Sequence, residues 1–165
     1  MIKIRAVNET ELEAVNRLIA AAVMTWLLPE RVKRLSLPVY RYNHQDLVHL
    51  RMVVAEDQRQ HIVGVAAWER ADPRDAPAGQ RALLLHGIYV EPRYHRQGIG
   101  RRLFTAAEDA VGRHHCDGLL VKAQQDATAF FTSLGMRPLP VEEPSRQYAN
   151  RLWKAIPDQR SVTGD

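Results

Sequence analysis

Residues 86 to 103 restrict what this chain can fold into more than any other segment. An apolar run ends at Val90, a polar turn with glycines at positions 98 and 100 follows, and helical spacing of apolar residues begins at Ile99. This order predicts a buried strand, a glycine turn and a helix in direct succession. The first turn of a helix has free N–H groups and the positive end of the helix dipole, and glycine lets a bulky group approach the backbone. The segment therefore predicts a phosphate-binding loop.

Positive charge is concentrated near this turn. Lys and Arg outnumber Asp and Glu by 23 to 19, and 19 of the 23 cations are Arg, whose planar guanidinium suits phosphate and carboxylate. In and beside the turn, Arg93, Arg96, Arg101 and Arg102 oppose the single acid Glu91. A net charge of +4 is low for a nucleic-acid-binding protein, so we expect a small anionic ligand and no nucleic acid.

Two widespread phosphate-binding motifs do not match the turn. The dinucleotide fingerprint needs a third glycine at the position of Leu103, and the Walker loop needs a Gly-Lys-Ser or Gly-Lys-Thr sequence that the chain lacks. The phosphates must therefore belong to another class of ligand.

The pattern along the rest of the chain predicts an α+β fold. We expect one domain over residues 1–156 and a C-terminal tail over 157–165. Gly87 inside a strand suggests a bulge or a close backbone approach, and Pro38 should end the helix that Pro29 opens. Asn8 and Glu11 form a capping-box pattern before the first helix. The expected strands cover residues 2–5, 52–56, 62–69, 82–90, 118–122 and 148–156, and the expected helices cover 8–22, 29–35, 98–113 and 126–135.

The composition also indicates the compartment. Cys116 is the only cysteine, which excludes an internal disulfide and a cysteine-rich zinc site. His114 and His115 precede it, but adjacent side chains do not converge easily on one ion, so we expect no metal. The chain begins with charged residues, and its most apolar run, residues 18–28, is about half the ~20 residues that span a bilayer. We expect a cytoplasmic protein without a membrane segment.

Two motifs resemble the GNAT superfamily of N-acetyltransferases. Val90-x-Pro92 followed by His95-x-x-Gly98-x-Gly100 is similar to the acetyl-CoA signature of that family, and residues 126–136 resemble its second motif, a short helix with an aromatic pair. The order of elements resembles the family over nearly the whole chain. The resemblance implies a mixed, mostly antiparallel sheet, splayed between its fourth and fifth strands and flanked by helices. It also implies acetyl-CoA as co-substrate and no metal.

The resemblance further implies which residues hold acetyl-CoA. The backbones of Ile88 and Val90 would pair with the pantetheine arm where their strand splays from Gly118–Lys122, and amides from Arg96 through Arg101 would surround the pyrophosphate. The implied cofactor-binding residues are Ile88, Val90, His95, Arg96, Gln97, Gly98, Ile99, Gly100, Arg101 and Phe130.

Two positions depart from the family pattern. His95 stands where Gln or Arg is usual, and we expect a modest effect because backbone amides would make most of the contact. Phe131 stands where a Tyr usually protonates the departing CoA thiolate, and a phenyl ring donates no proton.

His86 and Glu69 are the candidate catalytic residues, as rival general bases. Alternation places His86 on the same strand face as Ile88 and Val90, and its position is similar to that of a catalytic histidine in the aralkylamine branch of the family. An imidazole accepts a proton readily near neutral pH. The structural alternatives are a core histidine bonded to a backbone carbonyl and a surface glutamate.

The acceptor is expected at the first two helices and the last hairpin, where the family builds its acceptor site. Trp26, Tyr40 and Tyr148 would line a pocket for an aromatic or amphipathic amine; alternatively, Trp26, Leu27 and Leu28 are only the core stripe of a helix. The expected function is direct acetyl transfer from acetyl-CoA to an amine of a small molecule or peptide. The alternative is a CoA-binding module with weak or no transferase activity. Members of the family often dimerise, which leaves a homodimer open.

Overall fold

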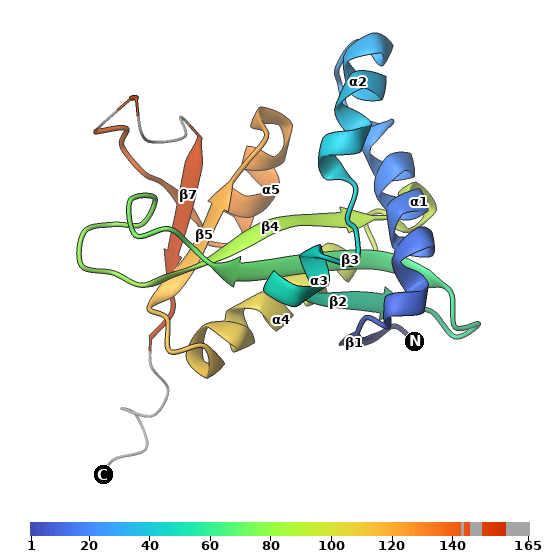
Figure 1. Cartoon of the computed structure of the whole chain (residues 1–165), viewed down its shortest axis with the longest axis horizontal. Helices are drawn as coiled ribbons and strands as arrows, with labels where there is room; N and C mark the ends of the chain where they lie inside the picture. The colour runs from blue at the N-terminus through green and yellow to red at the C-terminus, as the bar shows by residue number, and fades with distance from the viewer. Residues whose placement is uncertain (143, 146–149, 158–165) are drawn as a thin grey trace. The chain divides into compact units, whose positions relative to one another are not determined.

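The computed structural model describes residues 1–142, 144–145 and 150–157 (Figure 1). Its strands are β1 (Lys3–Ala6), β2 (Arg51–Glu56), β3 (Ile62–Arg70), β4 (Ala82–Val90), β5 (Gly118–Lys122), β6 (Arg137–Pro138) and β7 (Arg151–Ala155). The α-helices are α1 (Leu12–Val23), α2 (Glu30–Tyr40), α3 (Asp46–His49), α4 (Ile99–Arg113) and α5 (Thr128–Ser133), and the 3₁₀ turns are η1 (Glu9–Glu11), η2 (Pro92–Tyr94) and η3 (Gln125–Ala127).

The strands form one mixed sheet in the order β1-β2-β3-β4-β5-β7-β6. β4 and β5 run parallel, whereas β1 with β2, β5 with β7 and β6 with β7 are antiparallel. The predicted α+β class with a mixed sheet is thus confirmed. β6 has no counterpart among the predicted strands, because a two-residue strand has no periodicity. No described helix is both long and apolar enough to cross a membrane.

The contacts divide the chain into two compact units, each built from two sequence segments. Unit 1 comprises residues 1–67 and 88–104, and unit 2 comprises residues 68–87 and 105–165. β3, β4 and α4 contribute to both units, and each unit is described by itself. The single domain over 1–156 stays a prediction, and of its tail over 157–165 all but Pro157 lies outside the described residues.

In unit 1, α1 packs on one face of β2 and β3. Its apolar residues recur at helical spacing, and the face that they form is buried. The buried cluster around α1 contains Leu12, Val15, Leu18, Ile19, Ala22, Val23, Leu50, Met52, Val54, Val65, Ala67 and Tyr89.

The start of α4 packs on the opposite face of β3, at Gly64. A Cβ at this position would lie 3.0 Å from the Leu103 side chain and 3.1 Å from that of Ile99. Because successive strand residues face opposite sides, Gly64 turns away from the α1 cluster that contains Val65. The missing side chain allows the first turns of α4, and the loop before them, to lie close to the sheet.

α2 runs further than predicted. It continues through Pro38 to Tyr40. Because Pro38 lies in the last turn, its missing N–H removes only a bond near the helix end, so the break expected there does not occur. Lys33 of α2 is buried, and its Nζ donates to the Met24 carbonyl at 2.7 Å, which links α2 to the C-terminus of α1.

In unit 2, the first half of β4 pairs with β5, from Ala82 opposite Gly118 to Leu85 opposite Val121. β4 then continues to Val90. The loop between β3 and β4 is tied to β7 through Arg151, which is 3% exposed and donates to the carbonyls of Asp75 and, at 2.9 Å, Pro140.

Candidate active site

The loop between β4 and α4 contains the predicted phosphate site. After η2 the chain turns through residues 95–98, and α4 begins at Ile99. Arg96 has a φ of 65° and Gly98 a φ of 80°, whereas Gln97 between them is not among the residues with positive φ. Such alternation turns successive backbone N–H groups toward one side and forms a concave anion site.

The amides of this loop are available to a ligand. The His95 N–H donates to the Pro92 carbonyl at 3.2 Å, and the Arg102 N–H donates to the Gly98 carbonyl at 3.1 Å. The dihedral angles of His95 and Arg96 are those of a type II turn, which directs the Gln97 N–H back toward the Tyr94 carbonyl. Among the described residues, no backbone carbonyl accepts from the N–H groups of residues 98 to 100. Residues 95 to 98 are exposed, while the Ile99 side chain is buried and anchors the helix start. The backbone geometry is that of an anion-binding helix N-terminus.

Two of the four expected arginines are engaged with the protein itself. Arg93 Nε donates to Glu91 at 2.7 Å, and Arg102 donates to the Ile2 carbonyl. For the Arg96 side chain the described residues include no hydrogen-bond or ion-pair partner. His95 Nε2 lies 3.1 Å from the Val90 carbonyl, within the loop's own hydrogen bonds. Arg93 and Arg102, two of the four arginines in and beside the turn, therefore bind groups of the protein itself.

Sequence analysis missed a hydrogen bond that fixes this loop. Tyr94 donates through its hydroxyl to Asp57 at 2.9 Å, and Asp57 also accepts the N–H groups of Arg59 and His61, each at 2.9 Å. The backbone hydrogen bond from His61, then the bond from Tyr94, lower the pKa of Asp57. The turn between β2 and β3 thus holds the loop. A turn-forming aspartate is a recognisable signal, but its distant partner is not.

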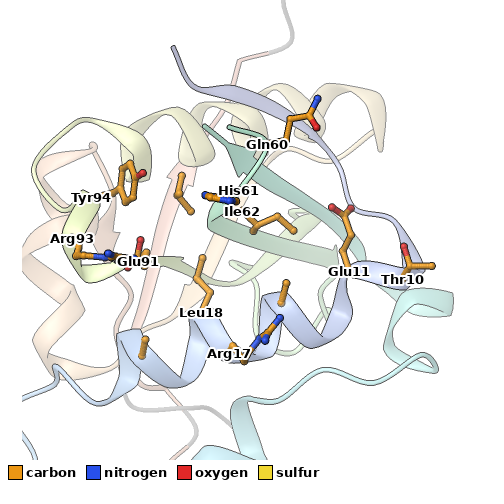
Figure 2. Close-up of a pocket in the computed structure, with 13 residues that line it drawn as sticks. Thr10, Glu11, Arg17, Leu18, Gln60, His61, Ile62, Glu91, Arg93 and Tyr94 are labelled. Carbon is orange, nitrogen blue, oxygen red and sulfur yellow. Dashed lines mark hydrogen bonds and ion pairs between the residues drawn. The ribbon is translucent and has the colours of Figure 1, made fainter. Parts of the chain in front are cut away.

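Beside the loop lies a cavity of about 530 Å³ (Figure 2). Leu18 and Arg17 of α1 line it, with His61 and Ile62 at the start of β3 and Tyr94 of the loop. None of the predicted site residues lines this cavity; the nearest lining residues in the chain are Arg93 and Tyr94.

The two rival bases form a hydrogen-bonded pair in unit 2. Nε2 of His86 on β4 lies 2.6 Å from Oε2 of Glu69 on β3. Their side chains are 33% and 36% exposed, so the pair lies in a position that a ligand can reach. The histidine is not the buried core histidine of the structural alternative, and the glutamate is not an isolated surface charge.

A register shift between β3 and β4 accompanies this pair. Ala71 donates to the Ala82 carbonyl, and Glu91 donates to the Val63 carbonyl. From the first bond to the second, β3 goes back eight residues while β4 advances nine. Between these two bonds β4 therefore contains one residue more, as a β-bulge requires, and Gly87 lies within this stretch. Ile88 and Val90, the expected pantetheine contacts, follow in the half-buried end of β4.

The aromatic pair of α5 is divided between surface and core. Phe130 is 38% exposed, Phe131 is 4% exposed, and their ring centroids are 5.2 Å apart. Phe130 is open to a ligand, as expected of a cofactor contact. Phe131 is a core residue without a proton to donate.

Trp26 and Tyr40, two of the predicted substrate residues, lie together in unit 1. Their rings meet edge to face, with centroids 5.1 Å apart. Tyr42 and Tyr89 belong to the same packed cluster as these two rings. Burial, followed by the nearby Tyr42 and Tyr40, raises the pKa of Tyr89. Leu27 is 89% exposed, so the helix core stripe proposed as the alternative is wrong there. The remaining predicted substrate residue, Tyr148, lies outside the described residues.

No three His, Cys, Asp or Glu side chains are grouped to hold a metal ion within the described parts of the chain. Cys116 is half-buried, and its Sγ lies 3.6 Å from the His114 carbonyl.

Comparison with known proteins places this geometry in a family. A family model described as "Acetyltransferase (GNAT) family" matches residues 20–136. A search of the curated proteins found no significant match.

Solved structures share the fold over most of the chain. The PaiA N-acetyltransferase of Thermoplasma acidophilum, in complex with coenzyme A, is 12% identical with a TM-score of 0.72, covering 94% of this chain and 99% of its own. A GNAT family acetyltransferase of Brucella melitensis, in complex with acetyl-CoA, is 14% identical with a TM-score of 0.66, covering 95% of this chain and 89% of its own. The ribosomal-protein-S18-alanine N-acetyltransferase of Escherichia coli is 18% identical with a TM-score of 0.61, covering 94% of each chain. At these identities the likeness concerns the fold.

Proposed function

Because the chain belongs to the GNAT family of acetyltransferases, we propose that it transfers an acetyl group from acetyl-CoA directly to an amine of a small molecule or peptide. The observation that carries this proposal is the junction of the loop with α4, where three consecutive backbone N–H groups, those of residues 98 to 100, have no backbone acceptor among the described residues. Such a loop fits the pyrophosphate of CoA.

In this proposal backbone groups bind the cofactor. The amides of residues 96 to 101 hold the pyrophosphate, with Arg96 available for a phosphate oxygen, and His95 shapes the loop through its contact with the Val90 carbonyl. The backbones of Ile88 and Val90 hold the pantetheine arm, and exposed Phe130 contacts the cofactor. The structures of similar fold in complex with CoA and acetyl-CoA support this assignment.

The chemistry needs a base more than an acid. An alkylamine with a pKa of ~10.4 is mostly charged at pH 7, and freeing its lone pair costs about 4–5 kcal/mol. A thiol with a pKa of ~8.5 leaves as thiolate at a disadvantage of only about 2 kcal/mol. Phe131 in place of a proton donor is therefore tolerable, whereas a base is required.

We assign the base to the His86–Glu69 pair. As the amine nitrogen bonds to the acetyl carbon and the carbon–sulfur bond breaks, the amine's proton passes to the pair and the sulfur leaves with the bonding electrons. The thiolate then takes a proton from the pair or from solvent. No positioned nucleophile is found among the described residues of the proposed site, which supports direct transfer without an acyl-enzyme.

The acceptor site is proposed at Trp26 and Tyr40, with Tyr148 as a further wall. Aromatic rings bind aromatic or amphipathic amines through their faces and attract a cationic ammonium group. Two proteins of similar fold are named as N-acetyltransferases, and one of them is named for an alanine of a ribosomal protein, which supports an amine as acceptor.

The test is release of free thiol from acetyl-CoA with a panel of aromatic, aliphatic and peptide amines. His86→Ala should lower kcat by ~10²–10⁴ and leave acetyl-CoA affinity unchanged, because general-base catalysis contributes about that factor. His49→Ala, at an exposed position ending α3, is the matched control and should keep full activity. Calorimetric binding of CoA without turnover of any amine would instead favour the CoA-binding module.

A further inference from the structure

The hydrogen bond between His86 and Glu69 determines which nitrogen of the imidazole carries a proton. A carboxylate only accepts hydrogen bonds, so at 2.6 Å from Oε2 the Nε2 atom of His86 must be the donor. A neutral imidazole has one N–H and one lone pair. The lone pair therefore resides on Nδ1.

Nδ1 is free to meet a substrate. The described residues include no hydrogen-bond partner for it, and the side chain is one-third exposed. On Glu69, in contrast, Oε2 is already occupied by the ring. A proton that reaches Nδ1 creates an imidazolium whose charge is next to the carboxylate, and a charge-assisted hydrogen bond of this length stabilises it.

We infer that Glu69 is a positioning residue, which holds His86 in the Nε2–H tautomer so that Nδ1 takes the amine's proton. The inference rests on the proposed function. Nε2 keeps its proton throughout, Nδ1 gains the amine's proton while the C–N bond forms and the C–S bond breaks, and Nδ1 afterwards returns that proton to the thiolate or to solvent. The two residues are thus not rival bases: only His86 contacts the acceptor.

Nitrogen spectroscopy tests the tautomer without any substrate. Long-range proton–nitrogen spectra of the uniformly ¹⁵N-labelled protein, with the His86 signals assigned by their loss in His86→Ala, should show a protonated Nε2 and an unprotonated Nδ1. In Glu69→Ala the chemical shifts of the two nitrogens should move toward the averaged values of a mixture of the two tautomers. An Nδ1–H tautomer in the wild type, or unchanged shifts in Glu69→Ala, would overturn the inference.

Kinetics test the division of roles. Removing the carboxylate that orients a metal-bound histidine typically costs 10–100-fold. By the same reasoning, Glu69→Ala should lower kcat at least 10-fold, with KM for acetyl-CoA within twofold. The double variant should be no slower than His86→Ala alone, because Glu69 acts through the ring. If Glu69 is itself the base, Glu69→Ala will be at least as slow as His86→Ala; if the two residues act independently, their effects will multiply in the double variant. Either result would overturn the inference.

Two controls keep the outcomes separate. Glu13→Ala, at an exposed position of α1, should change neither the spectra nor kcat. Thermal unfolding of Glu69→Ala shows whether this variant is folded. If it is not, Glu69→Gln takes its place, because a neutral amide no longer favours one tautomer of His86. If no amine is acetylated, the proposed function fails, and with it the kinetic role of Glu69, while the spectra still decide the tautomer.

Discussion

At the scale of single residues, the proposed anion site depends on backbone conformation. Gly98 has a φ of 80°, and a Cβ added there would meet nothing within 4 Å. A side chain at this position therefore strains the backbone and extends into open space, without colliding with the protein.

Gly98→Glu should weaken acetyl-CoA binding at least tenfold by calorimetry, because it puts a negative charge and bulk where the pyrophosphate would lie. Gly79→Glu is a matched control: its φ is 77°, its Cβ would also meet nothing within 4 Å, and it lies in the loop between β3 and β4. The control should bind acetyl-CoA within twofold of wild type. If the two variants bind acetyl-CoA with equal affinity, the loop does not bind the phosphates.

Residue spacing predicted the glycine turn but not the partners of its arginines. Glycines in a strand–turn–helix pattern are a local signal. The Arg102 side chain, in contrast, reaches the Ile2 carbonyl 100 residues away, and a long flexible side chain leaves no trace of such a partner in sequence. For the same reason His86 and Glu69 were predicted separately and as rivals, although their neighbouring strands bring them together.

At the scale of elements, the N-terminal segment is fastened by an ion-pair network. Arg5 of β1 donates to Glu56 of β2 at 2.7 Å and to Glu11 at 2.7 Å. Glu11 also accepts the Asn8 N–H at 2.8 Å, as in the expected capping box. The hydrogen bond from Arg5 lowers the pKa of Glu11.

Glu11→Gln should therefore destabilise the protein by about 1 kcal/mol at pH 7. A lowered pKa in the folded state means that the carboxylate stabilises the fold above its usual value of 4.5 and that this contribution fades as the pH falls through the lowered value. Urea midpoints of variant and wild type should converge on acidification below pH 4.5. Glu13→Gln should match wild type throughout, and a Glu11→Gln deficit that persists at pH 2 would contradict the argument.

The helices show which features of a helix the periodicity of apolar residues can predict. The helix over residues 8–22 was predicted, because one buried cluster covers α1 and 3.6-residue spacing reflects that contact. The end of α2 was not, since the effect of Pro38 depends on how near the helix end it lies. The exposure of Leu27 was missed because apolar character alone does not say that a residue is covered.

At the scale of the whole molecule, unfolding tests whether residues 1–156 are one domain. Trp26 belongs to unit 1, and Trp68 and Trp153 belong to unit 2. If the chain is one domain, variants with a single tryptophan in either unit should lose their fluorescence at the same urea concentration, and this should coincide with the loss of helical circular dichroism. Separate midpoints for the two reporters would mean that the units fold independently.

Acetyl-CoA should stabilise the whole chain, because a ligand that binds only the folded state raises its unfolding free energy. At a concentration of 100 times Kd the gain is about 2.7 kcal/mol, which for a chain of this size raises Tm by roughly 5–10 °C. Gly98→Glu should remove most of this rise, and Gly79→Glu should retain it. Duplex DNA or tRNA at the same phosphate concentration should leave Tm unchanged, since a net charge of +4 with Arg93 and Arg102 engaged internally offers little to a polyanion. If a nucleic acid raises Tm as much as acetyl-CoA does, and high salt abolishes the rise, the excess of arginine serves nucleic-acid binding instead.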